Sequence, residues 1–191
     1  MQANYLKEGD RSHLQSRLWR CRICSQAYIG DERPGVCPFC GAHSQYIIPS
    51  ENWKPEGGIA LSPVSRKNVE AALELEKSNT AFYLCVSRSS KDPFIQGMFR
   101  ALARVESEHV GIFTRILNSP GKASPDQPCT SADKRSVQES LDREIRAVAS
   151  YGKFVGETKE PRLKELFEAL VEIEGDHIAL DREVQKRMKW Q

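Results

Sequence analysis

The pair Glu106 and His109 is the feature of this 191-residue sequence that most clearly carries chemistry. The two residues are three positions apart, so an α-helix would place both side chains on nearly the same face. That face is otherwise apolar, with hydrophobic residues at spacings of three and four: Met98, Leu102, Val105, Ile112, Phe113 and Ile116. A carboxylate and an imidazole directed into an apolar core are costly unless an ion neutralises them. The pattern therefore indicates a pair of metal ligands.

The same pair occurs a second time in the chain. Glu174 and His177 repeat it at an offset of 68 residues (174 − 106 and 177 − 109). Surrounding residues repeat at this offset without a gap, as in Val69/Val137, Leu73/Leu141, Tyr83/Tyr151, Phe99/Phe167 and Leu102/Leu170. We predict an internal duplication of a helix pair, with residues 69–116 repeated as 137–184. One Glu-x-x-His is usually a surface pair or a core histidine, whereas two copies at one offset favour a shared metal site.

Two further glutamates complete the set at the same offset. Glu76 and Glu144 each begin a Glu-x6-Tyr pattern, which places them about two helical turns below Tyr83 and Tyr151 on the same face. One Glu from each of two helices plus one Glu-x-x-His from each of the other two is the ligand set of di-iron and di-manganese carboxylate bundles. Four carboxylates and two neutral imidazoles offset two divalent ions, and hard oxygen ligands suit iron or manganese. The two tyrosines are predicted to hydrogen-bond the ligand carboxylates, with ordinary core packing as the alternative.

Four of the six cysteines form a second candidate metal site. Two C-x-x-C pairs, Cys21/Cys24 and Cys37/Cys40, are separated by twelve residues. This spacing can hold one ion in a tetrahedron of thiolates, and the ion would supply much of the folding energy of so small a module. Iron and zinc both accept that geometry. A zinc ribbon that only holds a fold or docks a partner is the alternative interpretation.

Helix signals place these residues in one bundle. A polar residue followed by proline begins three predicted helices, with Ser62 as a capping residue at the first and with Asp92 and Glu160 at the other two. The four helices are predicted over residues 62–90, 92–118, 133–157 and 160–190. Short connections within each pair and a longer proline-rich loop between the pairs predict a mostly α fold, a ferritin-like four-helix bundle. We divide the chain into a leader at 1–16, a four-cysteine metal-knuckle domain at 17–46, a linker at 47–61 and the bundle at 62–190.

Composition excludes several classes of protein. Hydrophobic residues make up 39% of the chain, which is enough for a core. A net charge of +2 gives no electrostatic reason to expect nucleic acid or an anionic membrane as a partner. Without a long uncharged apolar run or a signal-like start, we predict a cytoplasmic protein.

Some notable residues belong to neither site. Glu108 and Asp176 each lie about 100° around the helix from the histidine that follows them, so we predict that they are solvated charges or charges at the rim of the site. His43 receives no role. Cys85 is expected to be a small buried apolar residue and Cys129 an exposed loop thiol.

Both motifs resemble those of the rubrerythrin family. The run Trp19-x-Cys21-x2-Cys24-x12-Cys37-Pro-x-Cys40 is similar to the rubredoxin-like module of rubrerythrins. The repeated Glu-x6-Tyr and Glu-x-x-His helices are similar to their di-iron bundle. The module here precedes the bundle, which resembles the reversed arrangement.

The resemblance implies a non-haem di-iron oxidoreductase that reduces hydrogen peroxide, or dioxygen, in defence against oxidative stress. An external donor would supply electrons through an iron (alternatively zinc) tetrathiolate centre, and the pair would be Fe–Fe, with Fe–Mn or Fe–Zn as alternatives. Glu106 and Glu174 would bridge the two ions. The terminal ligands would be Glu76, Glu144, His109 and His177. It also implies a homodimer, head-to-tail or helix-swapped.

The sequence departs from the rubrerythrin pattern at Ala147. Rubrerythrins carry an extra carboxylate there, one turn beyond the position of Glu144, and it helps one iron shift during peroxide turnover. The repeat-related residue, Asn79, is not a carboxylate either. The alternative function is therefore a ferroxidase or iron-handling bundle, with a zinc-filled knuckle that docks a partner.

Overall fold

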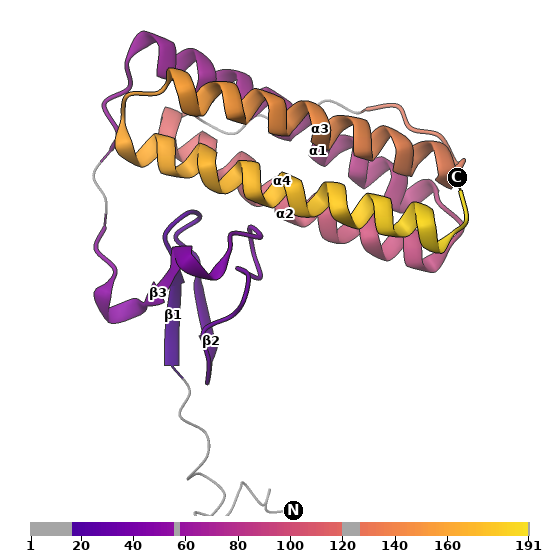
Figure 1. Cartoon of the computed structure of the whole chain (residues 1–191), viewed down its shortest axis with the longest axis horizontal. Coiled ribbons are helices and arrows are strands. Elements are labelled where there is room, and N and C mark those ends of the chain that lie inside the picture. Colours follow the sequence, from indigo (N-terminus) through magenta and orange to yellow (C-terminus); the bar gives the residue numbers. More distant parts are fainter. Residues whose placement is uncertain (1–16, 56–57, 120–126, 191) are drawn as a thin grey trace, which may run out of the picture.

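Four long helices form a bundle, and a small sheet lies against one side of it (Figure 1). The computed structural model describes residues 17–55, 58–119 and 127–190, so the predicted leader at 1–16 lies outside the described residues. The predicted fold class, a mostly α four-helix bundle with a small N-terminal four-cysteine domain, is confirmed.

The sheet has three antiparallel strands in the order β2-β1-β3. They are β1 (Arg17–Cys21), β2 (Ala27–Gly30) and β3 (Ile47–Pro49), and short 3-10 turns flank β3 at Ser44–Tyr46 and Ser50–Asn52. Strand β3 falls inside the segment predicted as a linker from residue 47. That boundary is wrong because Ile47 and Ile48 pair with Cys21 and Arg20. A strand of three residues ending in proline is too short to show an alternating pattern.

The helices are α1 (Pro63–Ser89), α2 (Pro93–Leu117), α3 (Asp133–Glu157) and α4 (Pro161–Arg187). Ser62 and Asp92 cap α1 and α2 by accepting hydrogen bonds from backbone N–H groups of the first turn. Glu160 instead accepts from the backbone N–H of Ser62, at 2.7 Å, and thereby ties the start of α4 to the start of α1. None of the described helices combines the length and apolar character needed to span a bilayer.

Aromatic clusters fill the bundle on either side of the glutamate level. On one side the rings of Phe82 and Phe99 pack around Tyr83, with centroids 5.6–6.3 Å apart. On the other, the rings around Tyr151 are those of Phe113, Phe154 and Phe167. Both tyrosines are fully buried. These clusters keep water from the polar groups between them.

Cys85 and Cys129 form a disulfide that joins α1 to the segment preceding α3, with the two Cα atoms 5.9 Å apart. Both residues are half-buried. The prediction of a buried apolar cysteine and a separate exposed loop thiol is therefore wrong. Two lone cysteines 44 residues apart show no spacing pattern from which a pairing could be inferred.

Replacing Cys85 and Cys129 together by serine should lower the free energy of unfolding by about 2–4 kcal/mol, because a crosslink over this loop restricts the unfolded chain. Denaturant unfolding with and without a phosphine reductant measures the effect. Reductant should destabilise the parent chain and leave the double variant unchanged. Equal stability of parent and variant would contradict this role.

Candidate metal centres

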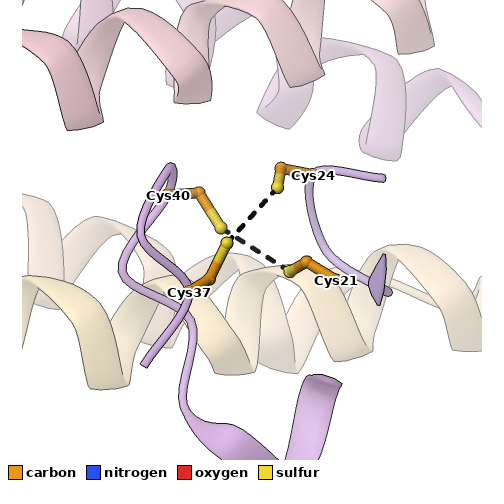
Figure 2. Close-up of side chains that lie close together, drawn as sticks. All are labelled: Cys21, Cys24, Cys37 and Cys40. Atoms are coloured by element: carbon orange, nitrogen blue, oxygen red, sulfur yellow. Dashed lines mark hydrogen bonds between the residues drawn. The ribbon is translucent and has the colours of Figure 1, made fainter. Parts of the chain in front are cut away.

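The four knuckle cysteines converge from two loops (Figure 2). The Sγ atoms of Cys21 and Cys40 lie 3.7 Å apart, as do those of Cys24 and Cys37, and all four side chains are buried. A tetrahedron of sulfurs with metal–sulfur bonds of about 2.3 Å has edges of about 3.8 Å. The observed spacing therefore fits one tetrahedral ion without rearrangement.

The electrostatics of the knuckle also call for a cation. Hydrogen bonds accepted from neighbouring thiols lower the pKa of Cys37, whereas bonds with their neighbours, together with burial, raise the pKa values of Cys24 and Cys40. Without an ion the cluster thus holds some of its protons. Four thiolates in one buried volume require a positive charge between them.

Each knuckle ends in a left-handed residue that follows its second cysteine, Ser25 at φ 65° and Gly41 at φ 79°. The backbone N–H groups of these residues donate to the carbonyls of Cys21 and Cys37 at 2.9 and 3.0 Å. Glycine takes this conformation freely, whereas serine does so at a cost. Gly41 also touches the bundle, since a Cβ there would lie 3.1 Å from Cγ2 of Ile173.

The six predicted ligands of the bundle meet in its middle, and they come from all four helices. They form two overlapping groups whose ligand atoms lie within 4.8 Å of one another: Glu76, Glu106, His109 and Glu174, and Glu106, Glu144, Glu174 and His177. Glu106 and Glu174 belong to both groups. Five of the six are fully buried, and His177 is 8% exposed. The sequence repeat thus becomes two adjoining half-sites that share two carboxylates.

Unpaired lone pairs show that this cluster fits two divalent ions. Both carboxylate oxygens of Glu174, and one each of Glu76 and Glu144, have no hydrogen-bond partner among the described residues. Nδ1 of His177 lies 2.8 Å from Glu174 and 3.2 Å from Glu106 without forming a hydrogen bond to either. Buried carboxylates without partners are strongly destabilising. Cations placed among these atoms would satisfy them together.

The tautomer of His109 is fixed from outside the cluster. Its Nε2 lies 2.9 Å from the main-chain carbonyl oxygen of Cys40. A carbonyl only accepts, so Nε2 must carry the proton. In neutral His109 the lone pair is then on Nδ1, which lies 3.0 Å from Glu106 and 3.5 Å from Glu76. A metal-binding histidine that donates its other N–H to a carbonyl is the usual arrangement.

The two tyrosines bond the glutamates crosswise. The hydroxyl of Tyr83 on α1 donates to Glu144 on α3, and that of Tyr151 on α3 donates to Glu76 on α1. The sequence predicts hydrogen bonds from these tyrosines to ligand carboxylates but does not indicate which glutamate each one reaches. Seven residues of helix span about 10.5 Å, too far for a hydrogen bond along one helix, so each tyrosine bonds the glutamate of the opposite helix.

Burial and mutual charge set the protonation of the metal-free cluster. Burial raises the pKa of Glu76 well above its usual value and that of Glu174 to about 8. Burial raises the pKa of Glu106 too, but the interactions of its carboxylate with Glu76 and with the two nearby histidines keep that pKa low. For His109 and His177 the nearby carboxylates outweigh burial and raise the pKa. In the metal-free protein, protons on some of these glutamates and histidines therefore balance the charge that metal cations would balance.

Family models match both parts of the chain. Residues 19–47 match the model for the rubrerythrin rubredoxin-like domain, and residues 67–131, which include most of α1 and all of α2, match the rubrerythrin model. The chain belongs to the rubrerythrin family. It is also similar to reverse rubrerythrin-1 of Clostridium acetobutylicum, 26% identical over 112 residues, a match that covers 53% of this chain and 62% of that protein. No solved structure matches the chain.

In this rubrerythrin the module docks on the bundle through repeat-related side chains. Nε2 of His43 lies 2.7 Å from Asp176, and the amide of Gln26 donates to Glu108 at 3.2 Å. Asp176 is exposed, as predicted for a rim charge, and Glu108 is half-buried, but both also contact the module, and His43 has a docking role that the sequence did not indicate. Their shared offset of 68 residues was the one signal that could have indicated a common function.

Two buried positions complete the comparison with the sequence. Ala147 packs in the apolar core, and Asn79 is buried with its side-chain N–H2 unpartnered among the described residues. This rubrerythrin therefore has no carboxylate at the extra family position. Sequence reasoning also missed Asp181, a fully buried carboxyl one turn after His177 on α4. Its spacing of four from the histidine could have placed it on the inner face.

We expect the stability of the metal-free protein to fall as pH rises. The folded-state pKa of Glu174, about 8, lies above its ordinary value of 4.5. The stabilisation from this proton is therefore complete below pH 4.5 and is lost as pH rises through about 8, by at most about 1.4 kcal/mol per pH unit. Melting curves with chelator should show the decline, and Glu174→Gln should flatten it. Added ferrous or zinc ions should abolish it, and a decline that persists with bound metal would contradict the assignment.

Gly41→Ala should destabilise the docked module, by about 1–2 kcal/mol from the left-handed backbone alone, with further loss from contact with Ile173. Gly35→Ala is the matched control, because it lies in the same module and a Cβ there meets nothing within 4 Å. Unfolding of the metal-loaded proteins compares the two. Equal losses of unfolding free energy in the two variants would show that the backbone conformation of Gly41 and its contact with Ile173 do not matter for stability.

Proposed function

We propose that this rubrerythrin is a non-haem di-iron oxidoreductase that reduces hydrogen peroxide to water, with electrons supplied through an iron held by Cys21, Cys24, Cys37 and Cys40. The observation that carries this proposal is the hydrogen bond between the Cys40 carbonyl and His109. It links a residue of one candidate metal site directly to a residue of the other. A module that served only as a structural knuckle would not need this contact.

The ligand roles follow from which residues belong to both half-sites. Glu106 and Glu174 lie in both groups and would bridge the two ions. Each ion would take one further glutamate and one histidine: Glu76 with His109, and Glu144 with His177. Two irons held there would polarise a bound peroxide and supply the two electrons that cleave its O–O bond.

The protein around the ions would control electrons, geometry and water. Reduction of one peroxide to two waters consumes two electrons and two protons. An iron held by the four thiolates would supply these electrons one at a time and would be re-reduced by the external donor. The Cys40 backbone and its carbonyl, hydrogen-bonded to His109, would provide the path between the two centres. Tyr83 and Tyr151 would hold the terminal carboxylates in place. The aromatic clusters on either side would exclude bulk water from the reaction.

This route lies within one chain, so it does not depend on a second subunit. The predicted homodimer, head-to-tail or helix-swapped, stays a prediction, as does the identity of the external electron donor. Dioxygen is the alternative oxidant, because it would meet the same ions and the same ligands.

A ferroxidase or iron-handling role with zinc in the knuckle is the second candidate. The absence of a carboxylate at Ala147 favours it, and the sulfur tetrahedron accepts zinc as well as iron. Colour separates the two roles, because ferric tetrathiolate absorbs visible light and zinc tetrathiolate does not. Protein grown with iron should be coloured under our proposal. Colourless protein that still takes up iron in the bundle would favour the alternative.

Glu106→Ala should abolish peroxide turnover by the iron-loaded protein, because it removes a carboxylate shared by both half-sites. Glu70→Ala, an exposed change on α1, is the control and should leave turnover unchanged. Turnover is followed as peroxide-dependent oxidation of the reduced tetrathiolate iron. Undiminished turnover in Glu106→Ala would end the proposal.

A further inference from the structure

The two half-sites differ in their surroundings although the sequence duplicates them. Beyond the half-site of Glu144 and His177 lie Ser140 and Asp181, both fully buried. The repeat-related residues in the other half, at the same 68-residue offset, are Ala72 and Phe113. One half-site thus adjoins a hydroxyl and a carboxyl where the other adjoins a methyl group and a ring.

Asp181 is a buried carboxyl of this region that none of the predicted metal-ligand roles includes. Neither of its carboxyl oxygens has a hydrogen-bond partner among the described residues. The charged groups that act on it are Glu144 of α3 and His177 of its own helix, and the Ser140 hydroxyl lies near enough to oppose the effect of burial. A buried carboxyl without a partner is expensive, so a purely structural reason for keeping it is hard to find.

Two successive hydrogen bonds connect Ser140 to the predicted ligand Glu144, and in both of them the donor is the residue nearer to Ser140. The Ser140 hydroxyl donates to the Tyr83 oxygen at 3.4 Å, and the Tyr83 hydroxyl donates to Glu144. A protonated Asp181 beside Ser140 would add a donor at the start of this row. Each hydroxyl can then give its proton to the next acceptor toward Glu144 and receive a proton from the preceding donor. A proton that leaves Asp181 is thereby matched by a proton that arrives at Glu144.

The opposite half-site is closed to such a path. His109 is fully buried and its Nε2 proton is committed to the Cys40 carbonyl. His177 is 8% exposed. One turn along α4 from Asp181, Gln185 hydrogen-bonds Gln138 of α3 at the surface, so water lies about one helical turn away. Electrons and protons would therefore reach the centre from different half-sites.

We propose that Asp181 donates, through Ser140, Tyr83 and the Glu144 carboxylate, which passes them on, the protons consumed when peroxide is reduced at the Glu144 half-site. The inference rests on the proposed function. Each peroxide takes two electrons from the metal centres and two protons along this row, forms two waters, and leaves Asp181 to be reprotonated from solvent. Burial raises the pKa of Asp181 to about 8, so the metal-free protein holds this proton at neutral pH.

The main test compares Asp181→Asn with the parent, both loaded with iron. Stopped-flow absorbance follows oxidation of the prereduced tetrathiolate iron after mixing with peroxide. The variant should be at least tenfold slower at unchanged iron content, with a larger solvent deuterium isotope effect. Glu183→Gln is the matched control: it makes the same carboxyl-to-amide change two residues away at an exposed position and should leave the rate unchanged. Unchanged rates in Asp181→Asn, or a slower rate explained by lost iron, would overturn the proposal.

Chemical rescue separates proton donation from a structural role. Asp181→Ala should regain speed when formate, a small weak acid, is added. Ser140→Ala should be slow without rescue, because its donor remains and the next step is missing; Ala72 shows that alanine is accommodated at the repeat-related position. No rescue of Asp181→Ala, or equal rescue of both variants, would overturn the proposal. If the parent itself fails to react with peroxide, the proposed function fails instead.

A readout independent of turnover is the infrared spectrum of the metal-free protein. The parent minus Asp181→Asn difference at neutral pH should contain the carbonyl stretch of a protonated carboxylic acid, and this band should fade as pH rises through about 8. Its absence at neutral pH would show that Asp181 holds no proton to give.

Discussion

Burial of four carboxylates at one level of the bundle is the constraint on which the rest of the structure depends. Water cannot reach Glu76, Glu106, Glu144 or Glu174, so their charge must be balanced by protons or by cations. The side chains around the four glutamates bind them and shield them from water. Tyrosine hydroxyls cross the bundle to the two glutamates of α1 and α3, and aromatic rings above and below keep the dielectric low. A helical scaffold without metal would have no use for such an arrangement.

The N-terminal module turns a nearly symmetric bundle into an asymmetric one. It lies between repeat-related contacts, with Gly41 near both Val105 of α2 and Ile173 of α4. One module cannot contact both halves alike, however. Its Cys40 carbonyl bonds His109, while His177 has no corresponding contact with the module among the described residues. The duplication supplies two equivalent half-sites, and a single docking event makes them different.

What the sequence could predict follows from how local each signal is. Proline and capping residues mark where the helices begin, and a gapless repeat places the six ligand side chains on inner faces. Features that depend on the distance between helices carry no such signal. The crosswise bonds of Tyr83 and Tyr151, the disulfide between Cys85 and Cys129, and the docking of His43 all join segments whose separation is set only by packing.

The same reasoning explains why protons and electrons would be separated in this fold. A hydrogen bond that would conduct electrons to His109 needs close packing of the module, and this packing leaves His109 fully buried, away from the water that could deliver protons there. A proton path must therefore begin on the side that the module leaves uncovered. In the duplicated sequence a change at two positions is sufficient, because Ser140 and Asp181 replace an alanine and a phenylalanine of the other half. Repeats tolerate such changes when each half keeps its own ligands, so function can diverge around an unchanged set of metal-binding side chains.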